Sequence, residues 1–430
     1  MVAQQRLTFT MKSQTRRTFL QRSLATTGLV LSQECGAWSA NQAKRPKLPV
    51  AGVATVYHRN SHAHVILGKI LEGFNQDGGP GPDLELVSLY MDQYPESDMS
   101  RELAQKHGFR LAKTIDEAIN LGGDTVQVAG VLSIGEHGDY PYDPVTRQHM
   151  YPRKRFFDEI VAALKRGGKF VPVFNDKHLS WRTDEAIAMY RTAKNLGIPF
   201  MAGSSIPVAW RIPALELQLG CDMRGALAIG FSGLEAYGFH ALEGLQCMVE
   251  RRNGGEVGVE SVRAVQGAPV LEAEQQGYWS RDLLAAALRA QSTDLPDDWR
   301  QAVTKHPFYL IDYRDGFKAC VAMLSGIALN FSFACQLKDQ SAPTATKFAL
   351  QEGPPYRHFE WLVKASEHMV HTGKPAYPVE RTVLTTGIID AAMRSLSKDG
   401  QRIETPLLDI PYRALTWAHA PGSPPKPREW

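Results

Sequence analysis

The first half of the chain alternates between short apolar runs and amphipathic segments. Apolar runs rich in β-branched residues are typical of strands that are buried on both faces. Such runs lie at residues 50–57, 84–90, 125–134, 170–174 and 198–202. Segments with helical periodicity follow them at residues 62–74, 100–107, 114–119, 156–166 and 184–195. Strands and helices that alternate in this way predict right-handed crossovers and a doubly wound parallel sheet.

The pattern changes after Ala202. Strand-like stretches with hairpin-like separations lie at residues 226–231, 259–266, 308–313, 317–323 and 327–336. Helical segments lie at residues 237–252, 357–371 and 380–397, and a last extended piece covers residues 402–412. This half of the chain therefore predicts an α+β domain built on a mostly antiparallel sheet.

The composition is typical of a globular protein of two domains. The chain has 430 residues, of which 43% are hydrophobic and 22% are charged. The formal net charge of +3 is small and dispersed, so we expect no nucleic-acid partner. The five cysteines contain no C-x-x-C pair, which excludes a zinc ribbon and argues against a disulfide scaffold.

The N-terminus has the order of features that is typical of a cleavable export signal. Arg16 and Arg17 precede a weakly apolar run at residues 24–32, and small residues follow at 37–40. The paired arginines indicate the twin-arginine pathway, with Met11 as a second possible start. Because the apolar run is shorter than the roughly 20 residues that cross a bilayer, we expect export of a soluble protein to the periplasm or another extracytoplasmic compartment.

Polar loops follow four of the predicted parallel strands. Open α/β sheets bind their ligands outside the carboxyl ends of their strands, so these loops are expected to meet at one edge. The candidate binding residues in them are Ser61, His62, Asp92, Glu136, His137, Asp176 and Lys177. The ammonium group of Lys177, which comes directly before the imidazole of His178, is the most informative of these groups.

A second candidate cluster lies on the helix predicted at residues 237–252. His240, Glu243 and Cys247 are three and four residues apart, so they share one face of that helix. A histidine with a carboxylate one turn away is an arrangement suited to proton transfer.

These motifs together resemble the glucose–fructose oxidoreductase, inositol dehydrogenase and MocA (Gfo/Idh/MocA) family. Lys177 stands where the family has the lysine of its Glu-Lys-Pro motif, and His240-Ala-Leu-Glu243 resembles its His-x-x-Asp motif. The most specific match is the closing segment, residues 389–406, within a resemblance that covers about residues 49–412.

The resemblance implies an NAD- or NADP-dependent oxidoreductase acting on a hydroxyl group of a sugar or cyclitol. In this reading Lys177, His240 and Glu243 are the candidate catalytic residues. Lys177 polarises the substrate oxygen, His240 accepts the hydroxyl proton and Glu243 orients the imidazole. The cofactor-binding candidates are Ser61, His62, Asp92, Glu136, His137 and Asp176. The partner is a small sugar-like molecule, and the family's large sheets allow a homo-oligomer.

The N-terminal pattern, the resemblance and the composition together divide the chain into four parts. Residues 1–40 are the twin-arginine signal, 48–203 a Rossmann-like domain, 204–412 an α+β domain for substrate binding or oligomerisation, and 413–430 a Pro-rich tail. The composition of the tail predicts disorder.

The turn after the first strand departs from the family pattern. The family has a glycine-rich turn there, because the backbone must approach the cofactor pyrophosphate closely. Residues 57–62 contain no glycine. Two alternatives therefore stay open: a non-catalytic carbohydrate-binding relative, and a metal-dependent enzyme that uses its His-rich loops. The possible metal ligands are His58, His62, His64, Glu136, His137, Asp139, Asp176 and His178, although no pair of them has a diagnostic metal-binding spacing, so none is assigned as a ligand.

Overall fold

The computed structural model describes residues 46–428. The export signal predicted at residues 1–40 lies outside the described residues. The chain from Lys47 onward forms one compact unit that contains both predicted sheets. Among the described residues, no helix is both long enough and apolar enough to cross a bilayer.

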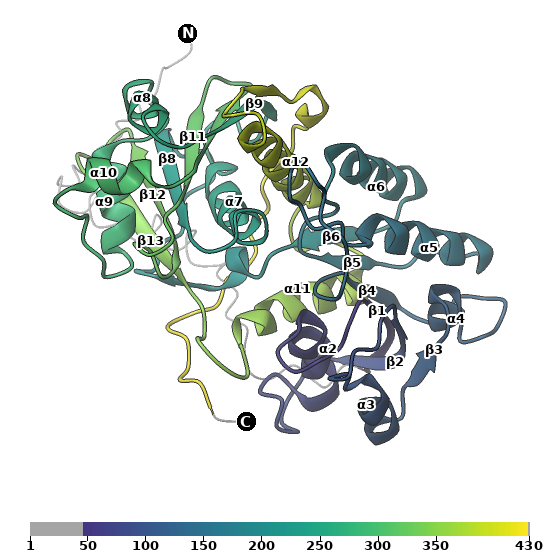
Figure 1. Ribbon diagram of the computed structural model, residues 1–430. Helices are drawn as coiled ribbons and strands as arrows, with labels where there is room; N and C mark the ends of the chain where they lie inside the picture. The colour runs from purple at the N-terminus through teal and green to yellow at the C-terminus, as the bar shows by residue number, and fades with distance from the viewer. Residues whose placement is uncertain (1–45, 429–430) are drawn as a thin grey trace, which may run out of the picture. The chain divides into compact units, whose positions relative to one another are not determined.

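The first sheet is six-stranded and entirely parallel, with strand order β3-β2-β1-β4-β5-β6 (Figure 1). Its strands are β1 (Leu48–Ala54), β2 (Leu84–Met91), β3 (Arg110–Ala112), β4 (Gly130–Ile134), β5 (Val173–Asp176) and β6 (Phe200–Gly203). The helices between them are α2 (His62–Glu72), α3 (Ser100–His107), α4 (Ile115–Asn120), α5 (Arg153–Arg166) and α6 (Thr183–Leu196). The predicted doubly wound sheet is confirmed, with the strand order reversing between β1 and β4.

Close packing of α2 on this sheet depends on a glycine in β1. A Cβ atom added at Gly52 would lie 2.8 Å from the side chain of Leu89 in β2 and 3.1 Å from that of Leu67 in α2. Residues with larger side chains would push the helix away from the strands. The position of α2 matters because its N-terminus contributes residues to the candidate site.

The second sheet is eight-stranded, with strand order β14-β9-β10-β11-β8-β12-β13-β7. Its strands are β7 (Trp210–Ile212), β8 (Met223–Gly230), β9 (Val259–Val265), β10 (Phe308–Tyr313), β11 (Lys318–Met323), β12 (Phe331–Leu337), β13 (Thr344–Ala349) and β14 (Ile403–Glu404). All its neighbouring strands are antiparallel except β8 and β11, which are parallel. The predicted mostly antiparallel sheet is confirmed.

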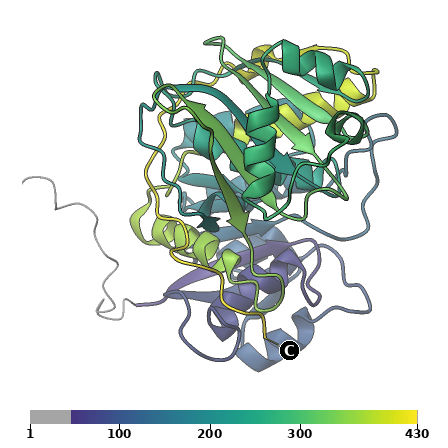
Figure 2. The same cartoon turned by 90° about the vertical axis from the view of Figure 1, so that its left-hand side faces the viewer.

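Both faces of the second sheet are covered by helices. One face packs against α7 (Ala236–Val249) and α12 (Val379–Leu396). The other face packs against a segment whose helices the sequence pattern did not predict, α8 (Pro269–Gln275), α9 (Arg281–Arg289) and α10 (Trp299–Thr304). Figure 2 looks onto this second face and shows green helices in front of the strands. Leu284 and Leu288 of α9 share a buried cluster with Leu227 of β8.

Helix α11 (His358–Thr372) returns the chain from the second sheet to the first. It packs beside α2, and Val370 lies so close to β4 that a Cβ atom at Gly130 would be 2.7 Å from its side chain (Figure 1). This return places the residues just before α11 next to the carboxyl edge of the parallel sheet.

The C-terminal segment differs from the prediction of disorder. The Ala420 N–H donates to the Val208 carbonyl at 2.9 Å, and the Trp210 indole N–H donates to the Pro421 carbonyl at 3.1 Å. Ala420 is fully buried against Trp210 and Ala349. The Pro-rich composition lacks apolar mass of its own, but here the rest of the chain supplies the donors and the apolar surface.

Candidate functional site

A buried chain of ion pairs lies at the carboxyl edge of the parallel sheet. Glu136, from the loop after β4, lies 3.3 Å from the ammonium of Lys177 and accepts a hydrogen bond of 2.5 Å from Arg153. The other side of the Arg153 guanidinium donates to Nε2 of His178 at 2.9 Å. Burial alone would raise the pKa of Glu136, but Lys177 and Arg153 outweigh it and hold that pKa well below its usual value. Glu136 is therefore a buried anion.

The backbone at Lys177 is fixed in an unusual conformation. Lys177 has a φ of +68°, and its N–H donates to the carbonyl of Gly203 at the end of β6 at 3.1 Å. This contact closes the edge between β5 and β6 and holds the lysine side chain over the sheet towards Glu136. Lys177 is only 3% exposed.

The N-terminus of α2 supplies a second contact across this edge. The Ser61 hydroxyl caps the helix, accepting from the backbone N–H groups of His64 and His58 at 3.2 Å each. His62 follows it, and its Nδ1 lies 2.6 Å from the Asp176 carboxylate at the end of β5. Ser61 is thus occupied as a cap, whereas His62 and Asp176 form a pair, as expected from loops that meet at one edge.

His240 comes from α7 and is held by a serine that follows β6. Its Nδ1 lies 2.6 Å from Oγ of Ser204, which also accepts the N–H of Ile206 at 3.0 Å. Burial, together with the nearby Lys177 and His62, lowers the pKa of His240 well below its usual value. The imidazole is therefore neutral at physiological pH.

Glu243 does not orient the imidazole directly, contrary to the prediction from the motif. Its carboxylate accepts the backbone N–H of Ser204 at 3.2 Å and hydroxyl groups of Thr385 at 2.6 Å and Thr382 at 3.2 Å. A Cβ atom at Gly203 would lie 2.4 Å from this carboxylate, so the close approach requires glycine there. Glu243 therefore acts on His240 through the position of Ser204.

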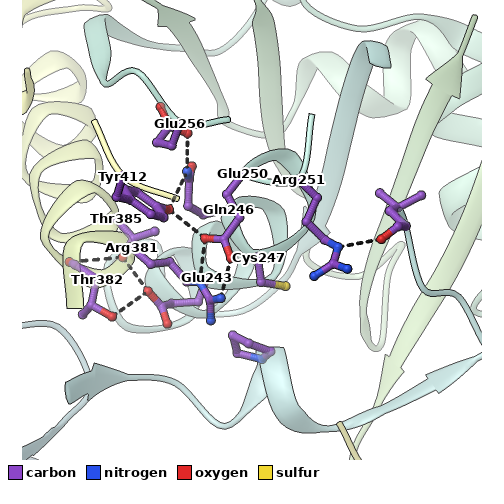
Figure 3. A network of polar contacts seen from close by, with 12 residues as sticks. Glu243, Gln246, Cys247, Glu250, Arg251, Glu256, Arg381, Thr382, Thr385 and Tyr412 are labelled. Carbon is purple, nitrogen blue, oxygen red and sulfur yellow. Dashed lines mark hydrogen bonds and ion pairs between the residues drawn. The ribbon is translucent and has the colours of Figure 1, made fainter. Parts of the chain in front are cut away.

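Figure 3 shows Glu243 as part of a larger buried network between α7 and α12. Glu250, two turns further along α7, forms two hydrogen bonds with Arg381 of α12, at 2.5 and 2.9 Å, and accepts the Tyr412 hydroxyl at 2.7 Å. Burial raises the pKa of Glu243. The network joins the helix that carries His240 to the helix that lies against α6.

A cavity of about 470 Å³ opens between these groups. The residues that line it come from the start of α2, the loops after β4, β6 and β8, helix α7, the start of β12 and the segment leading into α11. They are Asn60, His62, Val65, His137, Ser205, Ile206, Phe231, Tyr237, His240, Leu329, Asn330, Phe331, Leu350, Gln351, Glu352, Tyr356, His358 and Phe359. Its size suits a small ligand rather than a macromolecule.

The cavity is poor in positive charge. Among the described residues that line it there is no arginine or lysine. Burial, with a smaller contribution from His62, lowers the pKa of His137 to about 4, and burial lowers that of His358 to about 3. The imidazoles of His137, His240 and His358 therefore offer uncharged hydrogen-bonding groups.

The catalytic role of Lys177 stays a prediction. Lys177 is not among the residues that line the cavity, and its ammonium is paired with Glu136. It affects His240 through its charge, because a nearby cation disfavours the imidazolium form.

Asp92, the predicted ribose-binding acid, has no free carboxylate. Its two oxygens accept hydrogen bonds from the hydroxyls of Tyr90 at 2.7 Å and Tyr140 at 2.6 Å, and from Arg155 at 2.5 Å. An acid after a strand is visible in the sequence, but nothing local indicates that Tyr140 and Arg155 come to it.

Sequence reasoning missed the aromatic wall of the cavity. The rings of Phe231, Tyr237 and Phe331 contact one another, with centroids 5.0–5.9 Å apart, and those of Tyr237 and Phe331 contact His240. The available signal was the aromatic residue at the end of β8, Phe231, and at the start of β12, Phe331, since such rings bind flat apolar faces of ligands.

The metal-dependent alternative finds no geometric support. Within residues 46–428, no three histidine, cysteine, aspartate or glutamate side chains are grouped as a metal site requires.

No protein-family model and no curated protein sequence matches the chain, but solved structures do. GenD2 from gentamicin A biosynthesis, in complex with NAD, is 15% identical with a TM-score of 0.54 over 86% of this chain and 99% of its own. A myo-inositol dehydrogenase from Corynebacterium glutamicum is 12% identical, with a TM-score of 0.51 over 83% and 98%. An oxidoreductase from Agrobacterium radiobacter, in complex with NAD⁺, L-tartaric acid and magnesium, is 13% identical, with a TM-score of 0.50 over 83% and 98%. At these identities the likeness shows a shared fold, the Gfo/Idh/MocA fold that the motifs indicate.

Proposed function

We propose that this protein is an oxidoreductase that acts on a hydroxyl group of a neutral sugar or cyclitol, with NAD or NADP as cofactor. The observation that carries the proposal is the neutral imidazole of His240, held by Ser204 on the wall of a 470 Å³ cavity at the carboxyl edge of the parallel sheet. The solved structures that share its fold support it, because they include an NAD complex and an inositol dehydrogenase.

The role of His240 follows from its hydrogen bonds. Ser204 occupies Nδ1, so Nε2 is the ring nitrogen that is left for a substrate. For Nε2 to accept a proton, Nδ1 carries the hydrogen and donates it to Oγ of Ser204, which accepts the Ile206 N–H as well. A neutral imidazole so placed accepts the proton of a substrate hydroxyl as general base.

The substrate class follows from the lining of the cavity. An anionic sugar would need a cationic side chain, and none lines the cavity among the described residues. Neutral imidazoles and Ser205 offer hydrogen bonds to hydroxyl groups, and the aromatic wall offers a face for the ring of a sugar.

The fold implies a dinucleotide cofactor, and the residues present suit its nicotinamide end better than its adenosine end. A nicotinamide dinucleotide, when bound, supplies the hydride acceptor. Asn60 and His62 at the start of α2, together with Ser205, are the residues that would hold its nicotinamide half in the cavity. At the adenosine end the Asp92 carboxylate already accepts three hydrogen bonds, so a ribose there would have to compete with Tyr90, Tyr140 and Arg155 for its oxygens.

Replacement of His240 tests the proposal. With a panel of neutral polyols and NAD or NADP, His240→Gln is expected to lower kcat by about 100-fold or more, because a general base contributes that much. His306→Gln, at a histidine that does not line the cavity, is the matched control. Absence of polyol oxidation by the wild type would contradict the proposal.

The second candidate is a non-catalytic sugar-binding protein. The glycine-free turn at residues 57–62 and the engaged Asp92 favour it. Polyol binding by calorimetry without any turnover would support this candidate over the oxidoreductase.

We also propose that residues 1–40 direct export through the twin-arginine pathway. The proposal rests on Arg16-Arg17 and the apolar and small-residue segments behind them. Changing Arg16-Arg17 to Lys-Lys is expected to leave unprocessed protein in the cytoplasm, detected by fractionation and immunoblotting. Normal processing of that variant would contradict the assignment.

A further inference from the structure

The loop after β4 extends over the place where doubly wound sheets hold adenosine. In such sheets the pyrophosphate lies at the N-terminus of the helix after the first strand, and the adenosine ribose lies beside the end of the second strand. In this protein the side chain of Gln93, just past the end of β2, forms two hydrogen bonds with the backbone of Asp139 in that loop. Their lengths are 2.8 and 2.9 Å. Residues 135–152, which we call the cover segment, therefore reach from β4 across β1 to the end of β2.

The same segment hydrogen-bonds to Asp92, the acid that would bind the ribose. Tyr140 of the cover segment donates its hydroxyl to Asp92 at 2.6 Å, and Arg155 of α5 forms an ion pair of 2.5 Å with the other carboxylate oxygen. A ribose at this place would have to displace the tyrosine hydroxyl and compete with a guanidinium.

The cover segment is anchored to the protein interior at several points. The Thr55 hydroxyl, after β1, donates to the carbonyl of Glu136 at 2.7 Å. The ring of Tyr140 packs against that of Tyr151, and the guanidinium of the fully buried Arg153 lies over Tyr151 at 4.8 Å. These contacts continue into the buried ion pairs of Glu136, so the start and the end of the segment are tied to the core of the site, while its middle is exposed.

The nicotinamide end is built differently. Asn60, His62 and His137 line the open cavity, which continues to His240. At the same sheet edge, the nicotinamide end therefore opens into the cavity, whereas the cover segment lies across the adenosine end.

We infer that the cover segment fills the adenosine subsite, so that the cavity takes the nicotinamide mononucleotide half of a dinucleotide, with its phosphate at the backbone N–H groups of the α2 N-terminus, and the adenosine half adds no affinity. This inference rests on the proposed function, since it concerns how the cofactor of that function is held. Tyr140 and Gln93 are the residues that exclude adenosine.

Calorimetric titration with nicotinamide mononucleotide and with NAD tests the inference. For the wild type, the two dissociation constants are expected to agree within about threefold. For the double variant Gln93→Ala/Tyr140→Ala, NAD is expected to bind at least about tenfold more tightly than the mononucleotide. Tyr140→Phe, which removes one hydroxyl and keeps the ring, should give a smaller gain, and thermal melting checks that each variant is folded. Tyr142→Ala, at an exposed tyrosine of the same segment, is the matched control and should leave the ratio unchanged.

Every outcome decides the inference. NAD binding to the wild type at least about tenfold more tightly than the mononucleotide would overturn it. Failure of the mononucleotide to bind the wild type would overturn it, even if NAD bound the double variant. Failure of both ligands to bind either protein would overturn it. Polyol oxidation together with tight NAD binding would retain the proposed function and sink this inference. Equal binding of both ligands without polyol oxidation would support this inference and contradict the proposed function.

Discussion

At the scale of single residues, Ser204 determines how His240 is presented. The serine hydroxyl holds Nδ1, and the serine backbone is held in turn by Glu243. The His-x-x-Glu spacing on α7 therefore works through a residue of another element. A motif alone would have assigned the contact to the wrong pair of side chains.

Ser204→Ala is expected to lower kcat about tenfold with little change in KM, because one hydrogen bond of about 1.4 kcal/mol orients the imidazole. Ser204→Thr keeps a hydroxyl and should retain more activity. Steady-state kinetics on an oxidised polyol, with thermal melting of each variant, measures this. Equal kcat values for the alanine variant and the wild type would mean that the serine does not position His240.

At the scale of elements, α7 and α12 are joined by buried charges. Glu250 is 1% exposed and Arg381 is 5% exposed, and the two hydrogen-bond each other twice. A buried ion pair contributes little net stability compared with apolar residues, but loss of one partner leaves an unpaired buried charge.

Arg381→Met is expected to destabilise the protein by about 3–5 kcal/mol, because Glu250 then stays buried with the Tyr412 hydroxyl as its partner. The double variant Glu250→Gln/Arg381→Met removes the charge and should recover part of this loss. Urea unfolding followed by circular dichroism measures both. A single variant within about 1 kcal/mol of the wild type would show that the pair is not desolvated.

At the scale of the whole molecule, burial keeps a set of histidines uncharged. The pKa of His64, His137 and His178 is lowered to about 4 and that of His358 to about 3, in each case mainly by burial. Since the unfolded chain protonates its histidines near pH 6.5, it binds more protons than the folded chain below that pH.

Stability is therefore expected to fall as the pH decreases from about 6.5 to about 4, by up to about 1.4 kcal/mol per pH unit for each such histidine. The buried carboxyl groups with raised pKa, Glu243 and Asp390, act in the opposite direction but are fewer. Thermal melting at several pH values between about 7.5 and about 4.5 measures this decrease in stability. His358→Gln should make the decrease less steep. A melting temperature that does not change over this range would contradict the expectation.

Much of the fold was determined by sequence patterns, because periodicity and turn residues act between chain neighbours. The apolar runs placed the six parallel strands except β3, and α3 (Ser100–His107) agrees with its predicted bounds. Helices α8, α9 and α10 were missed, and length does not explain this, because α9 with 9 residues is longer than α3 with 8. Local reasoning also brought His62 and Asp176 to one edge, where they form a hydrogen bond.

Only the tertiary structure decided which side chains meet, because the partners are far apart in the chain and the folded backbone brings them together. Glu250 lies 131 residues from Arg381, and His62 lies 114 residues from Asp176. Whether Asp92 is free for a ligand depends on Tyr140, 48 residues away, and the position of Ser204 beside His240 depends on how α7 packs at the end of β6. The sequence determined which imidazole, carboxylate and ammonium groups lie at the sheet edge, since each loop carries its own side chains. Their pairing and charge states were decided by burial and by the neighbours that folding supplies.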